Sequence, residues 1–476
     1  MKVIIIGDGN VGYNIAENLS RYGNDVTIID KNAESRRKAL ENLDIRYVKG
    51  NGANASVLID AGVRSTDLLI AATSGDEMNM VCCLIARRLG TAHIVARIRD
   101  PEYADELSGI QEDLGLDMVI NPERAIAREI ARLLAFPPAI GVETFANGRV
   151  QMVEIKVLSG MPIANKQLMV ISRNIYQPIL IGAILRGDDV IIPNGGTVLL
   201  EGDVIYIVGR PSNVFRFCTL IGIQIRRIKN VMIIGGGRVG YYLARLLDEM
   251  GIGVKIVESA YERCVTLAEA LPEALVINGD GADDSLLRSE SVGEMGAFVS
   301  VTDRDEVNLM TALLAKRLGV PKVVAKISRA DYANLLGDIG LDNIVSPIAV
   351  TANYILRYVR GLQNAEGNTV NSLYRIIGDK AEAIEFTANE SAKMIGIPLK
   401  ELRLAPGVIV VIIVRKSKVI IPHGDDCIEL HDSVILMTKG LEPTDLNDII
   451  LSSDAPVFQH PAVVPIPPFA SMKGSA

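Results

Sequence analysis

Metal-binding and disulfide-forming side chains are scarce in this chain of 476 residues, which contains five cysteines, four histidines and no tryptophan. No two cysteines form a C-x-x-C pair, and no cysteine stands at metal-ligand spacing from a histidine. We therefore expect no metal site. The scattered, odd number of cysteines, behind an N-terminus that resembles a strand rather than a signal peptide, indicates a reducing cytoplasm.

Long apolar runs and an excess of positive charge are also missing. The longest uninterrupted apolar runs span about ten residues, as at 405–414, whereas a membrane-spanning helix needs about twenty. Lysine and arginine number 49 against 57 aspartates and glutamates, so the net charge is −8. These features weigh against a membrane span and against nucleic-acid binding, and they leave a membrane-bound partner open.

The chain contains a duplication. The segment VIIIGDGNVG at 3–12 returns as VMIIGGGRVG at 231–240. Three more pairs keep an offset of 229 residues: 50–54 with 279–283, 73–80 with 302–309, and 190–209 with 419–438. The sequence therefore predicts alternating N- and C-domains, with a disordered proline-rich tail at its end. Their expected bounds are 1–136 and 228–361 for the N-domains, 140–222 and 372–445 for the C-domains, and 452–476 for the tail.

Hydrophobic periodicity predicts the fold class. In the first repeat, short apolar strands alternate with amphipathic helices, which is typical of a parallel sheet built from βαβ units. The expected strands are 2–6, 25–29, 45–48, 67–72 and 93–97, and the expected helices are 11–22, 32–42, 54–60 and 77–89. Further helices are expected at 122–136 and 347–360, and short Val- and Ile-rich strands at 150–209 and 381–438. We therefore expect an α/β chain with two tandem Rossmann-like parallel-sheet domains, each followed by a small β-rich α+β domain.

The most specific motif is a G-x-G-x-x-G pattern between a strand and a helix, which occurs once in each repeat. Its glycines permit a tight turn, close approach of the backbone to a phosphate, and close helix packing, while the helix N-terminus favours an anion. The glycines are Gly7, Gly9 and Gly12 in the first copy, and Gly235, Gly237 and Gly240 in the second. One or both copies could also keep these glycines for the turn alone.

An acidic residue ends the second strand of each repeat, Asp30 in the first and Glu258 in the second. A carboxylate at this position accepts hydrogen bonds from ribose hydroxyls, and it would repel the 2′-phosphate of NADP. The sequence therefore favours NAD(H) or an adenine nucleotide over NADP.

Three pairs of polar residues end or follow strands at equivalent places in the two repeats: Arg97 and Lys326, Thr73 and Thr302, and Asn51 and Asp280. The cations could neutralise a pyrophosphate or form a salt bridge with a neighbouring acid. The threonines could cap the next helix or contact ribose or phosphate. The third pair could bind the adenine edge or stabilise a turn.

Groups that would catalyse a reaction are not recognisable beside the glycine loops. A dehydrogenase needs a proton-transfer group and a domain that holds substrate against the nicotinamide. No histidine can be placed near the loops, and the chain contains no nucleophile elbow or Walker lysine. Two nucleotide folds without a catalytic group indicate a sensor rather than an enzyme.

The duplicated glycine loops, the TSGDEMN and TDRDEVN segments and the VARIRDPEY stretch at 95–103 together resemble the TrkA family. The resemblance covers about 1–445. It implies RCK (KTN) domains that bind NAD(H) or ATP/ADP, and a homotetrameric ring. It also implies that the ring lies at the inner face of the cell membrane, beneath a TrkH- or TrkG-like subunit whose potassium path it gates.

The resemblance further implies a set of nucleotide contacts. In the first repeat they are Gly7, Asp8, Gly9, Asn10, Val11, Asp30, Thr73, Ser74 and Arg97. In the second they are Gly235, Gly236, Gly237, Arg238, Val239, Glu258, Thr302, Asp303 and Lys326. The chain departs from the family by a carboxylate in the first loop, by Asn51 where an acid is common, and by lysine at 326, so the preferred nucleotide stays open.

We interpret the chain as a regulator whose nucleotide shifts a hinge equilibrium between N- and C-domains. A γ-phosphate contact from Arg238 or Arg97 of a neighbouring subunit would distinguish ATP from ADP, and the helices at 122–136 and 347–360 would pair N-domains across a subunit interface. Two alternatives remain: an RCK-type regulator of another cation channel or antiporter, and a stand-alone NAD-dependent oxidoreductase.

Overall fold

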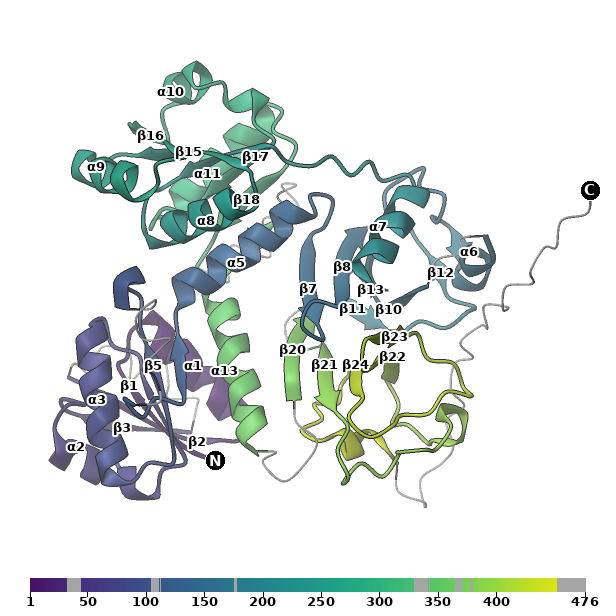
Figure 1. Ribbon diagram of the computed structural model, residues 1–476, viewed down its shortest axis with the longest axis horizontal. Coiled ribbons are helices and arrows are strands. Elements are labelled where there is room, and N and C mark those ends of the chain that lie inside the picture. The colour runs from purple at the N-terminus through teal and green to yellow at the C-terminus, as the bar shows by residue number, and fades with distance from the viewer. Residues whose placement is uncertain are drawn as a thin grey trace, which may run out of the picture. The chain divides into compact units, whose positions relative to one another are not determined.

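The computed structural model describes residues 1–31, 44–103, 111, 113–174, 178–328, 341, 343–363, 370–376 and 380–451. The helix expected at 32–42 and the tail expected at 452–476 lie outside these residues. The chain divides into two compact units, and each unit joins segments that are far apart in the sequence (Figure 1). The first unit contains the described residues of Met1–Ala135 and Ile228–Leu356, and the second contains the described residues of Phe136–Arg227 and from Arg357 to 451.

The first repeat opens with a six-stranded parallel sheet. Its strands are β1 (Lys2–Ile6), β2 (Asp25–Asp30), β3 (Ile45–Lys49), β4 (Leu68–Ala71), β5 (His93–Arg97) and β6 (Met118–Ile120). They lie in the order β3-β2-β1-β4-β5-β6, and every pair is parallel. The helices are α1 (Asn10–Arg21), α2 (Ala55–Asp60), α3 (Asp76–Leu89) and α5 (Pro122–Ala135), with the 3-10 turn η2 (Val63–Ser65). The strands and the described helices expected from periodicity are confirmed.

The second repeat forms a sheet of the same topology, which confirms the duplication. Its strands are β14 (Asn230–Ile234), β15 (Gly253–Glu258), β16 (Leu275–Asn278), β17 (Ala297–Ser300), β18 (Val323–Lys326) and β19 (Ile344–Val345). Their order is β16-β15-β14-β17-β18-β19. The helices are α8 (Arg238–Glu249), α9 (Tyr261–Ala270), α10 (Asp284–Ser289), α11 (Asp305–Arg317) and α13 (Pro347–Gln363), with the 3-10 turn η3 (Val292–Glu294).

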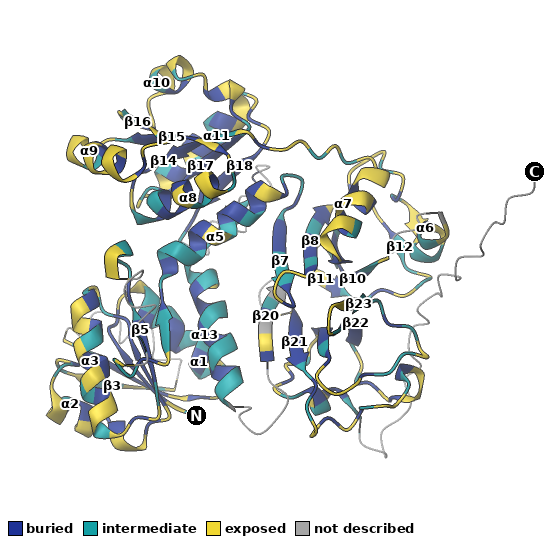
Figure 2. Ribbon diagram, viewed as in Figure 1, coloured by how far each residue is buried: buried dark blue, intermediate teal, exposed yellow. Residues whose placement is uncertain are grey.

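Apolar residues run without alternation along the central strands because helices cover both faces of these sheets. Val3–Ile6 on β1 and the whole of β4 are buried, and the central strands are dark blue in Figure 2. The apolar positions of α1 follow helical spacing, with Ile15, Ala16 and Leu19 facing the sheet. The carboxyl ends of β1 and β4 meet where the strand order reverses, which is where open α/β sheets bind their ligands.

The second unit consists of two five-stranded antiparallel sheets and a small two-stranded one. The first part contributes β7 (Gly141–Phe145), β8 (Val150–Lys156), β9 (Lys166–Gln167), β10 (Ile179–Arg186), β11 (Asp189–Ile191), β12 (Val198–Leu199), β13 (Val204–Gly209), α6 (Leu168–Asn174) and α7 (Pro211–Leu220). The second part contributes β20 (Val370–Ile376), β21 (Ala381–Thr387), β22 (Val408–Arg415), β23 (Lys418–Ile420), β24 (Ser433–Lys439) and the turns η4 (Leu399–Glu401) and η5 (Leu446–Ile449).

One hydrophobic core joins the two large sheets of the second unit. It contains Met152 and Tyr206 from the first part, and Val411 and Met437 from the second. Gly182 on β10 packs so closely that a Cβ there would lie 2.3 Å from the Met437 sulfur. The expected β-rich character of the small domains is confirmed, and each small domain buries its apolar face against the other.

Candidate functional site

The glycine loops follow β1 and β14 directly, at the strand ends where the sheet order reverses. Gly7 and Gly235 both have a φ of +104°, in the left-handed region that favours glycine. A Cβ on Gly12 would lie only 1.9 Å from the Gly7 carbonyl oxygen, and one on Gly240 would lie 2.2 Å from that of Gly235. Both loops therefore have the conformation that the motif predicts, and α1 and α8 begin against them.

The two acids contact the glycine loops through backbone amides. The Asp8 amide donates to Asp30 Oδ2 at 2.8 Å, and the Gly236 amide donates to Glu258 Oε2 at 2.8 Å. The second loop has an additional brace, because Arg263 Nε donates to the Gly236 carbonyl at 2.9 Å. Each acid thus stands beside the first turn of its loop, at the place where a ribose would lie in a Rossmann site.

The threonines lie against the first glycine of each loop. A Cβ on Gly7 would come within 3.0 Å of Thr73 Cα, and one on Gly235 within 3.2 Å of Thr302 Cα. Each threonine hydroxyl donates to an asparagine side chain, Asn79 in the first repeat and Asn308 in the second, at 2.7 Å in both.

The two cations form salt bridges. Arg97 pairs with Glu123 at 3.3 Å, and the two side chains are 15% and 19% exposed. Burial lowers the pKa of the Arg97 guanidinium, which nevertheless stays protonated at neutral pH. Lys326 pairs with Asp303 at 3.6 Å. A ligand phosphate at either cation would therefore compete with a carboxylate.

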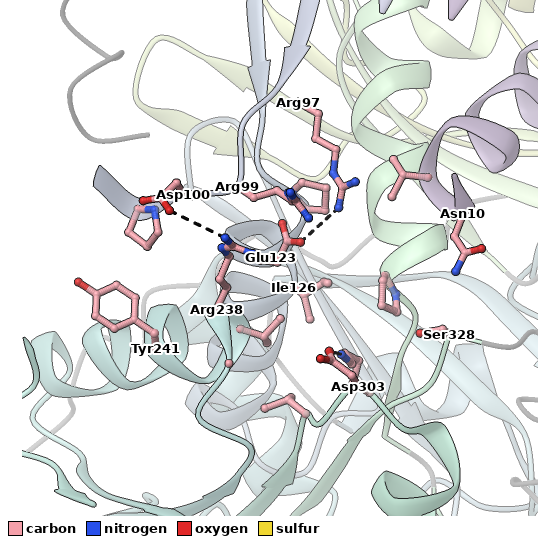
Figure 3. Close-up of a pocket in the computed structure, with 18 of the residues that line it drawn as sticks. Asn10, Arg97, Arg99, Asp100, Glu123, Ile126, Arg238, Tyr241, Asp303 and Ser328 are labelled. Carbon is pink, nitrogen blue, oxygen red and sulfur yellow. Dashed lines mark hydrogen bonds and ion pairs between the residues drawn. The ribbon is translucent and has the colours of Figure 1, made fainter. Parts of the chain in front are cut away.

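A cavity of about 1380 Å³ connects the two glycine loops within the first unit (Figure 3). Its lining includes Asn10 and Val11 from the start of α1, and Arg238 and Val239 from the start of α8. The cations described above, Arg97 and Lys326, line the same cavity. Within the described part of the chain, Arg97 Nε and Glu123 Oε2 are buried and make no hydrogen bond.

The segment that follows β5 contacts the helix that begins at the second glycine loop. Arg238 pairs with Asp100 at 3.9 Å, as the dashed line in Figure 3 shows. Tyr242 on α8 accepts from Asn121 Nδ2 at 2.8 Å and donates to the Arg99 carbonyl at 3.3 Å. The expected helix at 122–136 is α5. Its expected pairing of N-domains across a subunit interface is found instead within one chain, where α5 packs against α8 of the second repeat. The two sites therefore share contacts within one chain.

The third pair of polar residues stabilises turns. Asn51 Oδ1 accepts from the Ala53 amide at 3.2 Å, and Asp280 Oδ1 accepts from the Ala282 amide at 2.9 Å. A Cβ on Gly52 would lie 2.2 Å from Ile6 Cγ2, so the glycine of this turn permits close packing on β1. The sequence left open whether these residues bind the adenine edge or stabilise a turn, and the contacts described here stabilise a turn.

Sequence reasoning missed the asparagines and Glu123. The asparagines lie near the ends of the repeated segments at 73–80 and 302–309, so their recurrence at a constant offset could have indicated them. Glu123 stands at the start of α5, and no local pattern relates it to Arg97. Among the other expected contacts, the Ser74 carbonyl accepts from the Arg99 guanidinium.

The described residues offer no metal centre: no group of three or more His, Cys, Asp or Glu side chains among them could hold an ion. His93 lies on β5, near Asp117, and His423 lies beside Asp426 in the second unit. His460 is outside the described residues. Across the described ranges, no helix combines the length and apolarity that crossing a membrane requires.

Family comparison covers both repeats. Residues 3–122 and 231–347 match the TrkA-N domain, and residues 152–222 and 383–440 match the TrkA-C domain. The chain is 37% identical over 448 residues to "Trk system potassium uptake protein TrkA homolog 1" of Methanosarcina mazei, covering 92% of this chain and 98% of the relative. It is 34% identical to "Trk system potassium uptake protein TrkA" of Vibrio alginolyticus, covering 92% and 95%.

Solved structures with the same fold include "Crystal Structure of the GsuK RCK domain", with a TM-score of 0.62, 20% identity and 92% of each chain covered. Another is "GsuK channel bound to NAD", with a TM-score of 0.61 and 20% identity, covering 92% of this chain and 77% of the other. At this identity the likeness shows the fold alone.

Proposed function

The chain belongs to the TrkA family, and we propose that it is the nucleotide-binding regulatory subunit of a Trk-type potassium-uptake system. Curated relatives that are named as Trk potassium-uptake proteins match it over nearly their full length. We assign residues 1–136 and 228–361 to RCK N-domains, and 140–222 and 372–445 to TrkA C-domains.

The regulatory ligands in this proposal are NAD(H) and the adenine nucleotides ATP and ADP. The observation that carries the proposal is the repeated glycine loop, which has the same positive φ, the same close helix approach and the same acid contact in both repeats. One structural neighbour, the GsuK channel, has been solved bound to NAD. The proposed contacts are the residues that the family resemblance implies, together with Gly12, Asn51, Gly240 and Asp280.

Switching in this proposal is a population shift between two arrangements of the first unit. A ligand moves such an equilibrium only by its difference in affinity for the two states. Arg238 is the source of that difference in this proposal, because it pairs with Asp100 across the shared cavity, and a γ-phosphate would compete for its guanidinium. ATP and ADP would then stabilise different arrangements of α8 relative to the segment after β5.

We propose that copies of the chain assemble into a homotetrameric ring at the inner face of the cell membrane, under a TrkH- or TrkG-like subunit. One face of α3 exposes Met78, Val81 and Leu84, which are 36%, 44% and 45% exposed. Met310 on α11, in the second repeat, is 65% exposed. Adjacent exposed apolar side chains commonly mark protein interfaces, and here the proposed occupant is a second copy of the chain.

The protein is proposed to act without catalysing a reaction. Regulation of another cation channel or antiporter is the second candidate, supported by the fold that the chain shares with a channel's RCK domain. A stand-alone NAD-dependent oxidoreductase is a remote third candidate. Consumption of NADH in the presence of a substrate would favour that third candidate and count against the proposal.

Potassium flux through vesicles that contain the Trk membrane subunit tests the proposed function. We expect flux to depend on added purified protein and to differ between ATP and ADP. The matched variants Arg238→Ala and Arg97→Ala test the switch. The variant that lacks the arginine in contact with the γ-phosphate should give similar potassium fluxes in ATP and in ADP. Flux that is indifferent to the protein and to nucleotide would refute the proposal.

A further inference from the structure

We propose that Asn79 and Asn308 are positioning residues of the two nucleotide sites. Each orients the hydroxyl of its threonine so that this hydroxyl accepts a hydrogen bond from the ligand, and each fixes the strand end that carries the neighbouring cation. The inference rests on the proposed nucleotide binding. It adds that, in one ligand contact, the ligand donates the hydrogen bond and the threonine accepts it.

Asn79 connects the ends of β4 and β5 through its amide group. Its Oδ1 accepts from the Thr73 amide at 2.8 Å and from the Thr73 hydroxyl at 2.7 Å. Its Nδ2 donates to the Arg97 carbonyl at 2.8 Å and to the Thr73 carbonyl at 3.3 Å. Because a backbone N–H must meet an acceptor, the contact with the Thr73 amide fixes which side-chain atom of Asn79 is oxygen.

Asn308 repeats these contacts in the second domain. Its Oδ1 accepts from the Thr302 amide at 2.8 Å and from the Thr302 hydroxyl at 2.7 Å, and its Nδ2 donates to the Lys326 carbonyl at 2.9 Å. Here Ser300 adds a further donor to Oδ1 at 3.0 Å. The two asparagines occupy equivalent positions of the duplicated segments 73–80 and 302–309, and the network recurs at both glycine loops.

Both asparagines are completely buried, with exposed fractions of 0%. A buried amide is tolerated only when its hydrogen-bonding capacity is satisfied, and an unsatisfied one is strongly destabilising. The core beside α3 includes the buried Cys82 and Ala86, whereas Ser300 and Thr311 are further buried polar residues beside Asn308. A polar side chain here is therefore explained by the two strand ends that it connects.

The threonine hydroxyl has a single proton, which it shares in the hydrogen bond that it donates to Asn79 Oδ1. The other acceptor within reach of the Thr73 hydroxyl is the Gly75 carbonyl, at the longer distance of 3.3 Å. The Gly75 amide donates to the same oxygen at 3.3 Å, so what the hydroxyl can offer a ligand is its remaining lone pair. Phosphate oxygens of a nucleotide are acceptors, so the matching ligand group is a donor. We assign it to a ribose hydroxyl rather than to the adenine amino group, because the acid beside the loop marks the ribose position.

The threonine lies at the right place for such a contact. Thr73 Cα is 3.0 Å from where a Cβ of Gly7 would stand, so the residue adjoins the first glycine of the loop. The acid Asp30 reaches the same loop through the Asp8 amide. A ribose held between the acid and the threonine would find acceptors on two sides.

Calorimetric titration of the full chain with ADP tests the positioning role through a double-mutant cycle. Asn79→Leu should weaken binding at the first site about tenfold, the value expected for one oriented hydrogen bond, and should leave the second site unchanged. Thr73→Val should cost a similar factor alone and nothing further in the Asn79→Leu background. Asn79→Asp keeps an acceptor oxygen for Thr73 but sets a carboxylate oxygen against the Arg97 carbonyl, so it should not restore the affinity lost in Asn79→Leu. Asn308→Leu is the matched variant for the second site.

Nucleotides that lack one ribose hydroxyl test whether the ribose donates a hydrogen bond to the threonine. Either 2′-deoxy-ADP or 3′-deoxy-ADP should bind more weakly than ADP to the wild type, and in Thr73→Val this difference should vanish at the first site and persist at the second. If both bind as ADP does, the hydroxyl does not accept from ribose and the inference fails.

The outcomes separate the inference from the proposed function. Absence of nucleotide binding to the wild-type chain would refute the function itself. Normal binding with additive effects of Thr73→Val and Asn79→Leu, or a lower melting temperature with unchanged affinity, would leave the function standing and assign the asparagine a purely structural role.

Discussion

Raising the pH from 5 to 8 should destabilise the second unit through one carboxyl group, that of Glu154 on β8. Tyr374 of the second C-domain donates a hydrogen bond to this carboxyl, and Tyr206 on the neighbouring β13 is a second partner. Burial is the largest effect and raises the pKa of Glu154 from 4.5 to about 7, with repulsion from Glu143 acting in the same direction. The two tyrosines oppose this rise because they favour the charged form.

The sign follows from proton linkage. Between pH 4.5 and about 7 the folded chain keeps a proton on Glu154, which the unfolded chain has released, so stability falls as the pH rises through this window and levels off above it. At about 1.36 kcal/mol per pKa unit the full effect would be about 3 kcal/mol. Because Glu154 keeps part of its surface exposed, we expect about 2 kcal/mol between pH 5 and 8.

Thermal denaturation of wild type and Glu154→Gln at pH 5 and pH 8 measures this effect. Glutamine is neutral at both values, so the variant should lack this part of the pH dependence. For a domain of this size about 2 kcal/mol corresponds to a shift of about 5 °C in the transition of the second unit. Glu201→Gln removes one exposed carboxylate and controls for the change in net charge.

Tyr374→Phe provides an independent check, because it removes a hydrogen bond that lowers the pKa of Glu154. In this variant the loss of stability should extend to higher pH than in the wild type. Identical pH dependence in wild type and Glu154→Gln would refute the account of this carboxyl group.

Three further predictions concern the first unit. Gly12→Ala would place a Cβ 1.9 Å from the Gly7 carbonyl oxygen, so thermal denaturation should show a loss of stability of about 2 kcal/mol or more. Titration should show no nucleotide binding at the first site. Unchanged binding would contradict the close approach of α1 to the loop. Asp30→Asn should reduce the preference for NADH over NADPH about tenfold, measured by nucleotide fluorescence, because a neutral amide no longer repels a 2′-phosphate; an unchanged preference would mean that Asp30 does not contact the ribose. Tyr242→Phe removes the hydrogen bond from Asn121 and should lower the melting temperature by a few degrees, whereas no change would show that this contact between the repeats is not formed.

Local pattern was sufficient to predict the sheets of the first unit. The apolar run before Gly7 is continuous because β1 is buried on both faces, and the helical spacing in α1 follows from packing on one face. These features depend on neighbours within a few residues, so periodicity detects them. The pairing of domains depends instead on distant residues. The two N-domains pack together, and so do the two C-domains, through contacts between residues more than 100 positions apart, which periodicity cannot detect.

The same distinction applies within the candidate site. The glycines and the acids were predictable, because the glycines share one turn and each acid ends the strand beside it. Whether Arg97 meets a phosphate or an acid depended on Glu123, which lies 26 residues later and reaches it only through the fold. Asn79 was missed because nothing within its own helix indicates that an asparagine there is completely buried, and only its recurrence as Asn308 could have indicated it.

Calorimetric titration of the wild-type chain with ATP, ADP, NADH and NADPH tests the central claim most directly. The account predicts saturable binding of adenine nucleotides or NADH with up to two sites per chain, much weaker binding of NADPH, and no turnover. Two sites would mean that both glycine loops hold ligand, and one would mean that one repeat serves as scaffold. No binding of any of these nucleotides would contradict the account and reduce both glycine loops to structural turns.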